Sequence, residues 1–272
     1  MQKLWTLAIA HLFLGGICMY GHSVEIIGHR GASYDAPENT VVSVLTAWKQ
    51  GADSAEIDIH LTQDNRIVLM HDDNTKRITG ADHQIAETAS DVLRQLDAGG
   101  WKDPKFTGER IPFLEEILPT IPEKRRLFIE IKCGPEILPY LKTVIEKSGK
   151  SQQIVIIGFD LDTVAKSKEL MPNLPAYWLK STEKEKDTGV LIPHGKELIP
   201  TAQEKGLDGL DVQHSGVTRE FVDAVHKAGL RLYVWTVNDP DEARRLKELG
   251  VDGITTDRPG WLRAQLAEKQ GL

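Results

Sequence analysis

Cysteine is scarce in this sequence. The chain of 272 residues has two cysteines, Cys18 and Cys133, and Cys18 lies in an apolar segment at the amino terminus. If that segment is removed, Cys133 remains alone and no intrachain disulfide can form. The fold must then depend on its hydrophobic core, which a hydrophobic content of 40% is able to supply.

The sequence also lacks a dense group of basic residues and the histidine-rich or cysteine-rich pattern of a zinc site. The sequence has 33 Lys and Arg against 40 Asp and Glu, a formal net charge of −7, with no long basic run. This balance argues against nucleic acid or an anionic membrane surface as the main partner. We expect a small-molecule substrate, no nucleic acid and no obligatory protein partner, with any phosphate recognised locally.

Residues 1–23 have the composition of an export signal. Lys3 supplies a positive charge, residues 4–20 are almost wholly apolar, and residues 21–23 offer small side chains near a cleavage point. We expect export to the periplasm or the extracellular space, with residues 24–272 as the mature domain. The alternative is a retained membrane anchor, because the apolar length nearly permits a membrane span. Ile17 stands where a lipoprotein signal normally has a small residue, which argues against lipidation of Cys18.

The rest of the chain alternates between short apolar strands and amphipathic helices, without internal repeats. Eight parallel strands with helices between them predict an α/β fold, the TIM (β/α)8 barrel. Between the second and third strands, an excursion at 67–71 precedes a small insertion at about 74–110, expected over the barrel mouth. The strands are expected at 24–28, 55–61, 126–132, 153–159, 176–180, 209–213, 231–236 and 252–257. The helices are expected at 41–48, 112–121, 135–148, 161–171, 194–205, 219–228, 240–249 and from 259 onward.

The second strand carries an unusual acidic face. Glu56, Asp58 and His60 share one side because successive side chains alternate along a strand. A polar turn at 63–66 then returns the chain, and counting antiparallel partners brings His71 roughly level with Ile57 and Asp58. Two such carboxylates can converge on one hard divalent cation, although a solvated sheet face has the same pattern. His60 is interpreted as a surface residue of the hairpin.

Other strand ends add to this constellation. His29 and Arg30 follow the first strand between two glycines, and Glu130 and Lys132 share one face of the third parallel strand. Three carboxylates suit Mg²⁺ or Ca²⁺ better than zinc. His29 and His71 exchange protons near neutral pH, and Arg30 and Lys132 suit phosphate oxygens. The set describes cleavage of a phosphate ester.

Seven motifs in this order resemble the glycerophosphodiester phosphodiesterase family, from about residue 26 to 261: HRG at 29–31, PENT at 37–40, E-x-D at 56–58, HD at 71–72, E-x-K at 130–132, WTVN at 235–238 and TDRP at 256–259. The resemblance implies a TIM barrel with a small insertion and one bound Mg²⁺ or Ca²⁺. It also implies hydrolysis of glycerophosphodiesters to an alcohol and sn-glycerol 3-phosphate. The attacking oxygen is either water or the glycerol 2-hydroxyl.

The resemblance assigns roles to ten residues. It implies that His29 and His71 are the catalytic acid and base and that Glu56, Asp58 and Glu130 ligate the metal. The substrate-binding residues are Arg30, Lys132, Glu38, Phe159 and Trp235. Glu38 also fits the first turn of a helix, where an acid is favourable. Where the family often has serine before the phenylalanine, this chain has Gly158, which we expect to leave a rim position without a hydroxyl.

Two rival functions are weighed beside this one. The first is a related barrel phospholipase of the lysophospholipase D, sphingomyelinase D or phosphoinositide phospholipase C type. The second is a non-catalytic exported binding barrel, which would gain nothing from paired acid and base groups. Asp211 and His214 are interpreted as structural, and Cys133 as a packing residue.

Overall fold

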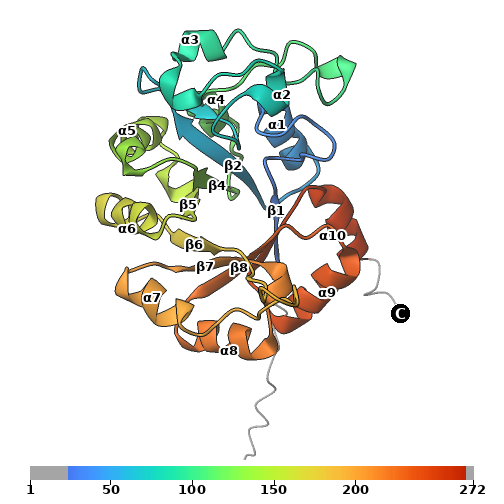
Figure 1. Ribbon diagram of the computed structural model, residues 1–272. Helices are drawn as coiled ribbons and strands as arrows, with labels where there is room; N and C mark the ends of the chain where they lie inside the picture. The colour runs from blue at the N-terminus through green and yellow to red at the C-terminus, as the bar shows by residue number, and fades with distance from the viewer. Residues whose placement is uncertain (1–23, 268–272) are drawn as a thin grey trace, which may run out of the picture.

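The computed structural model describes residues 24–267, which form a closed ring of strands surrounded by helices (Figure 1). The ring strands are β1 (Glu25–Gly28), β2 (Ser54–Leu61), β4 (Arg126–Ile131), β5 (Ile154–Gly158), β6 (Ala176–Lys180), β7 (Gly209–Gln213), β8 (Arg231–Trp235) and β9 (Gly253–Thr256). They pair in the order β1-β9-β8-β7-β6-β5-β4-β2, and a pairing of β1 with β2 closes the ring. All these pairings are parallel, so the predicted TIM barrel is confirmed.

The ring strands are covered on both faces, which explains their continuous apolar runs. Every residue of β5 is buried, with the sequence IVIIG. The outward side chains Ile57 and Ile59 of β2 join the large core between strands and helices. The inward side chains alternate with them, so the same strand directs Glu56 and Asp58 into the barrel.

Helices cover the outside of the ring (Figure 1). Side-chain caps begin several of them, including Thr40, Asp160, Thr218 and Asp239. The helices are α1 (Val41–Lys49), α4 (Leu114–Ile117), α5 (Leu138–Ser148), α6 (Leu161–Leu170), α7 (Leu198–Glu204), α8 (Arg219–Lys227), α9 (Pro240–Leu249) and α10 (Pro259–Ala267). Single 3₁₀ turns lie at Leu118–Thr120, Pro135–Ile137, Ser151–Gln153 and His214–Gly216.

Two predicted helices are shorter than expected. The helix expected over 112–121 divides into α4 and the 3₁₀ turn that contains Pro119. The helix expected from residue 194 begins only at Leu198, because His194 instead contacts the carbonyl oxygen of Gln213 at 2.8 Å through its Nε2 atom. The first difference lies in the second half of the expected helix and the second at its start, and both leave the barrel unchanged.

The excursion after β2 forms a hairpin. Strand β3 (Ile67–Leu69) pairs antiparallel with β2, with Ile59 opposite Leu69. The following insertion contains α2 (Lys76–Thr79), α3 (Ser90–Leu93) and 3₁₀ turns at Ile85–Glu87 and Pro104–Phe106. Its apolar residues form a separate small core with β3: Val68, Met70, Ile78, Ile85, Leu93, Ala98 and Ile111. The insertion therefore packs on the hairpin as a unit.

The amino-terminal end of the barrel is filled. Phe128, Tyr177 and Tyr233 pack together inside it, with Tyr177 and Tyr233 stacked at a centroid distance of 4.9 Å. Below them Arg126 forms an ion pair with Glu25. Since this end is closed, a ligand enters only from the carboxyl ends of the strands.

No helix within residues 24–267 is both long enough and apolar enough to span a membrane. The expected export signal at residues 1–23 lies outside the described residues.

Candidate active site

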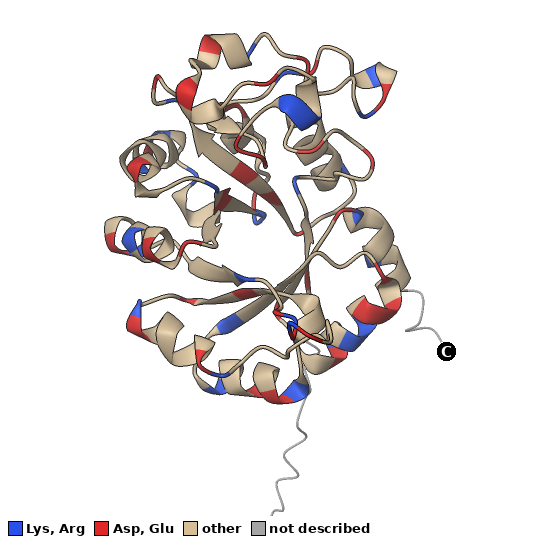
Figure 2. Ribbon diagram, viewed as in Figure 1, with Lys and Arg blue, Asp and Glu red and all other residues tan. Residues whose placement is uncertain are grey.

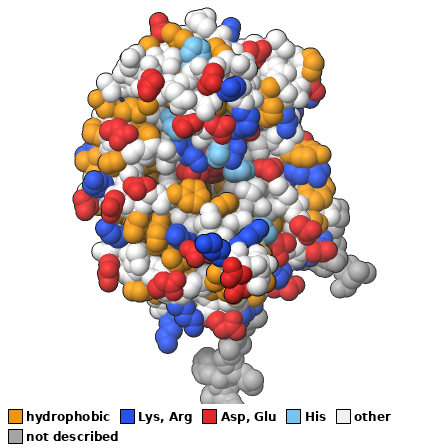
Figure 3. Space-filling model, in the orientation of Figure 1, with side chains coloured by type: hydrophobic (Ala, Val, Ile, Leu, Met, Phe, Trp, Pro, Cys, Tyr) orange, Lys and Arg blue, Asp and Glu red, His pale blue; other side chains and the backbone are white. Residues whose placement is uncertain are grey.

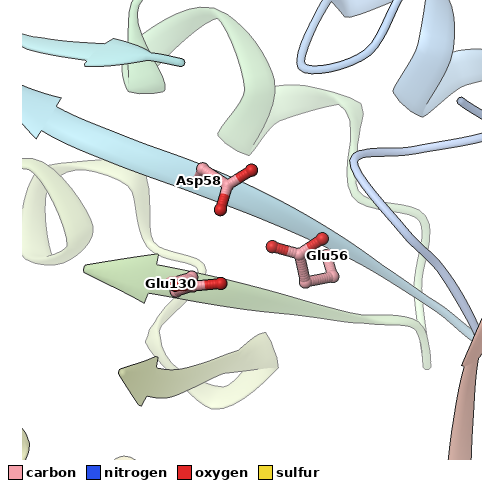
Figure 4. A group of neighbouring side chains, drawn as sticks. All are labelled: Glu56, Asp58 and Glu130. Carbon is pink, nitrogen blue, oxygen red and sulfur yellow. The ribbon is translucent and has the colours of Figure 1, made fainter. Parts of the chain in front are cut away.

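Three carboxylates converge inside the barrel. Glu56 and Asp58 come from β2 and Glu130 from β4, where Asp58 and Glu130 are directly paired in register. One oxygen of each lies within 4.8 Å of the others, and all three side chains point toward a common point (Figure 4). They are largely buried, with 3%, 1% and 9% of the residue exposed. Figure 2 shows acidic residues on β2, inside the surrounding helices.

The protonation of this cluster depends on burial and mutual repulsion. Burial, followed by the charges of Asp58 and Glu130, raises the pKa of Glu56 well above its usual range. Burial and then Asp58 raise the pKa of Glu130 to about 7. Burial alone would also raise the pKa of Asp58, but Arg30 and Lys132 outweigh it and the pKa is lowered. Positive charge bound beside the cluster would therefore stabilise the ionised carboxylates.

The cluster fits a divalent cation. The Oε1 atom of Glu56 is buried without a hydrogen-bond partner, although the other oxygen accepts a hydrogen bond of 2.8 Å from the backbone N–H of Arg30. An unpaired buried carboxylate oxygen is costly unless a ligand satisfies it. Carboxylate oxygens are the donors that Mg²⁺ and Ca²⁺ prefer. Glu56, Asp58 and Glu130 could thus hold such an ion together.

Two basic side chains border the cluster. Lys132 Nζ lies 2.7 Å from Glu130 Oε1 and 3.6 Å from Asp58 Oδ1. Arg30 Nε lies 3.3 Å from Asp58 Oδ2, and its Nη1 atom donates to Glu38 Oε1 at 2.8 Å. Both side chains line the cavity, so they are available to an anionic group bound beside the acids.

His29 is held by a carboxylate from the opposite end of the chain. Its Nδ1 atom lies 2.7 Å from Asp257 Oδ1. Asp257 also accepts hydrogen bonds from Ser33 and Asn238. Burial alone would raise the pKa of Asp257, but the hydrogen bond and charge of His29 hold it well below its usual range. With Nδ1 donating to Asp257, the Nε2 atom of His29 is left for the cavity.

His71 has an equivalent arrangement on the hairpin. Its Nδ1 atom lies 2.7 Å from Asp72 Oδ1, and Arg77 Nε donates to the other oxygen of Asp72 at 2.7 Å. The hydrogen bond from Arg77 is the main reason that the pKa of Asp72 falls to about 2. Burial lowers the pKa of His71, so the imidazole is neutral at pH 7. The predicted hairpin register is confirmed, since Met70 N–H donates to Asp58 O at 3.2 Å.

These groups border one cavity of about 280 Å³ at the carboxyl ends of the strands. Its other wall is apolar and includes Ile157, Leu179, Phe159 and Trp235. The rings of Phe159 and Trp235 meet edge to face at a centroid distance of 5.6 Å. Figure 3 shows histidine side chains beside Lys and Arg near the centre of this face, with hydrophobic side chains next to them. The cavity thus has a charged half and an apolar half.

The structure corrects two interpretations of the sequence. His60 is 7% exposed and its ring lies near the carbonyl oxygen of His71, so it is not a surface residue. A Cβ at Gly158 would meet Val164 Cγ2 of α6 at 3.0 Å, so a serine there would face the helix and no rim hydroxyl is missing. No residue of the insertion lines the cavity described above. The insertion instead supplies Arg77, which supports Asp72.

Eight of the ten predicted site residues line this cavity: His29, Arg30, Glu56, His71, Glu130, Lys132, Phe159 and Trp235. Asp58 lies in the acidic cluster with Glu56 and Glu130. The roles of all these residues stay predictions. Glu38 lies behind Arg30, where its carboxylate contacts both Arg30 and Arg77. Its contact with substrate stays a prediction.

Sequence reasoning missed four contributors. Asp72 and Asp257 orient the histidines, Asn39 binds Asp58, and Asp211 lines the cavity. Asp72, Asp257 and Asn39 stand inside the quoted HD, TDRP and PENT motifs, which was the available signal. Asp211 belongs to none of those motifs. Only the alternation of side chains along β7, which directs Asp211 into the barrel, could have indicated it.

Comparison with known sequences gives a consistent result. The model of the "Glycerophosphoryl diester phosphodiesterase family" matches residues 29–261. The protein YhdW of Bacillus subtilis (strain 168) is 34% identical over 244 residues, which cover 87% of this chain and 96% of the relative. A glycerophosphodiester phosphodiesterase of Caldanaerobacter subterraneus is 31% identical over 239 residues, covering 86% and 94%.

Comparison with solved structures agrees. An Oleispira antarctica phosphodiesterase, solved in complex with the product sn-glycerol-3-phosphate, superposes with a TM-score of 0.81. It is 28% identical in sequence, and the match covers 89% of this chain and 96% of that one.

Proposed function

The chain belongs to the glycerophosphoryl diester phosphodiesterase family, and on this premise we propose that it hydrolyses glycerophosphodiesters to an alcohol and sn-glycerol 3-phosphate. The observation that carries the proposal is the meeting of three carboxylates, two oriented histidines and two basic side chains at one cavity. A relative crystallised with sn-glycerol-3-phosphate supports the identity of the product.

Glu56, Asp58 and Glu130 hold one divalent cation, Mg²⁺ or Ca²⁺. When bound, this ion supplies Lewis-acid stabilisation of charge on the phosphate oxygens. Arg30 and Lys132 bind the non-bridging oxygens through charge-assisted hydrogen bonds, and their position beside the acids fixes the phosphate there. Phe159 and Trp235 contact the organic part of the substrate on the apolar wall, and Glu38 fixes Arg30 from behind.

His71 and His29 move the protons. His71 is neutral because burial lowers its pKa, so it accepts the proton of the attacking oxygen at its Nε2 atom. His29 is oriented by its contact with Asp257, and it donates a proton to the leaving alcohol. Asp72 and Asp257 keep each ring in the tautomer that these steps require. The same arrangement serves attack by water or by the glycerol 2-hydroxyl, and the second route passes through a cyclic phosphate.

The test is an assay of a diester panel with EDTA and with Mg²⁺ or Ca²⁺ restored. We expect sn-glycerol 3-phosphate from glycerophosphocholine, loss of activity with EDTA and recovery with the cation. Detection of a cyclic phosphate intermediate identifies the 2-hydroxyl as the attacker. Failure to release glycerol 3-phosphate from any glycerophosphodiester would overturn the proposal. The comparisons do not favour the barrel phospholipase alternative, which predicts choline release or cyclic phosphate from lipids.

We also propose that the protein is exported, with residues 1–23 removed or retained as an anchor. The support is the composition of that segment alone. Amino-terminal sequencing of the protein recovered from its producing cells measures this directly. A start at Met1 in the soluble cytosolic fraction would contradict it.

A further inference from the structure

Asp211 is a buried carboxyl group with no partner inside the protein. It lies on β7 and is 1% exposed, yet it lines the cavity. Its Oδ1 atom has no hydrogen-bond partner, and no ion pair involves its side chain among residues 24–267. Its backbone carbonyl oxygen accepts a hydrogen bond of 3.2 Å from Trp235 Nε1.

The other titratable groups of the cavity are all engaged. Each histidine has a carboxylate, and Glu56 accepts from the backbone of Arg30. Glu130 is paired with Lys132. Burying an unpaired carboxyl group destabilises the folded protein, and no side-chain contact of Asp211 within the described residues offsets this effect. An orphan group of this kind in a ligand cavity is explained if the ligand provides the missing hydrogen bond.

The surroundings favour a neutral partner over a cation. Asp211 is paired in register with Leu179, a residue of the apolar wall of the cavity. Burial, followed by the charge of Glu130, raises the pKa of Asp211 well above its usual range. A neutral carboxylic acid both donates and accepts a hydrogen bond, which matches an alcohol hydroxyl in both directions.

We propose that the carboxyl group of Asp211 determines specificity by binding a hydroxyl of the glycerol part of the substrate. The inference rests on the proposed function and adds a residue to it that the metal, phosphate and proton-transfer roles do not use. On the proposed function the phosphate binds beside Arg30 and Lys132, and Asp211 offers a hydrogen-bonding group next to Leu179 of the apolar wall. A diester without hydroxyl groups would leave Asp211 unpaired and would be disfavoured.

The test compares Asp211→Leu, which removes the polar atoms at similar volume, with Asp211→Asn, which keeps a donor and an acceptor. The measured quantity is the ratio of kcat/KM for glycerophosphocholine to that for bis(p-nitrophenyl) phosphate, a diester without hydroxyls. We expect the ratio to fall about 10- to 100-fold in Asp211→Leu, mainly through KM, and to stay within about threefold in Asp211→Asn. Asp211→Ala is the second variant if Asp211→Leu fails to fold.

Glycerophosphoglycerol is the control for a charged head group, since it has no ammonium. We expect each variant to change kcat/KM for glycerophosphoglycerol by the same factor as for glycerophosphocholine. A wild-type ratio in Asp211→Leu or Asp211→Ala would overturn the inference while leaving the proposed function intact. So would a loss in Asp211→Asn confined to glycerophosphocholine, which would mark an ammonium site. A wild-type protein that releases no glycerol 3-phosphate overturns the proposed function, and this inference with it.

Discussion

Asn39 binds Asp58 at two points. Its side-chain nitrogen donates to Asp58 Oδ2 at 2.8 Å, and its side-chain oxygen accepts from the backbone N–H of Asp58 at 3.0 Å. Asn39 is 3% exposed and has a φ of 56°, in the left-handed region that asparagine tolerates. One residue in a loop thus fixes both the side chain and the strand position of a carboxylate in the acidic cluster.

Removing the Asn39 side chain should weaken cation binding. In Asn39→Ala the carboxylate of Asp58 loses its orienting partner, and we expect the affinity for Mg²⁺ to fall about 10- to 100-fold. Titration calorimetry measures the change. Alanine also costs about 1–2 kcal/mol in the left-handed region, so Asn39→Gly is the matched control that removes the side chain without this strain. Equal affinity in wild type and Asn39→Gly would contradict the positioning role.

The carboxylates behind the histidines should act through tautomer and orientation. Asp257→Asn cannot accept from His29 Nδ1 in the same way, so we expect kcat to fall by roughly 10²- to 10⁴-fold. Cation affinity should stay near the wild-type value, because Asp257 lies outside the acidic cluster. Steady-state kinetics and calorimetry on the same preparation separate the two effects. A kcat close to that of wild type would refute the role of Asp257.

Cation binding should depend on pH through Glu130, whose pKa is raised to about 7 from 4.5. Between these values the cation-free folded protein keeps a proton that the unfolded chain has lost, so stability decreases as pH rises through this window. The cation requires the carboxylate and therefore expels the proton, so its apparent affinity increases up to about pH 7. Calorimetry in buffers of different ionisation enthalpy should show more proton release at about pH 6 than at about pH 8. A proton release independent of pH in wild type would count against this account.

Substitution of Gly158 by serine tests whether the end of β5 contributes to substrate binding. A serine at this position would press on Val164 and should lower the free energy of unfolding by about 1 kcal/mol. We expect no change in KM or kcat, because the side chain faces α6. Denaturant unfolding and the diester assay provide the two measurements, with Gly158→Ala as the control without a hydroxyl. A higher or lower KM in Gly158→Ser alone would show that the hydroxyl reaches the cavity.

The barrel could be predicted from the sequence because its strands are short, continuous apolar runs bounded by turn residues. Parity along β2 and β4 then sufficed to place Glu56, Asp58 and Glu130 inside. Sequence reasoning could not place His60, whose burial depends on the fold of the hairpin over it.

Contacts between distant segments were also beyond the sequence. Asn39 and Thr40 both precede α1 and are both residue types that cap helices, and only the structure separates them, with Thr40 as the cap and Asn39 on Asp58. The pairing of His29 with Asp257 joins the first and last strands of the ring, and no local pattern shows it. Asp211 was interpreted as structural because its lack of partners is visible only in three dimensions.

The central claim is that Glu56, Asp58 and Glu130 bind one divalent cation between His29 and His71. Anomalous diffraction from crystals soaked in Mn²⁺ tests it most directly, since Mn²⁺ accepts the same oxygen ligands as Mg²⁺. We expect a single strong peak bounded by oxygens of the three carboxylates, absent in crystals of Glu130→Gln or Glu56→Gln. A peak elsewhere in the cavity, or none among these carboxylates at saturating Mn²⁺, would contradict the account.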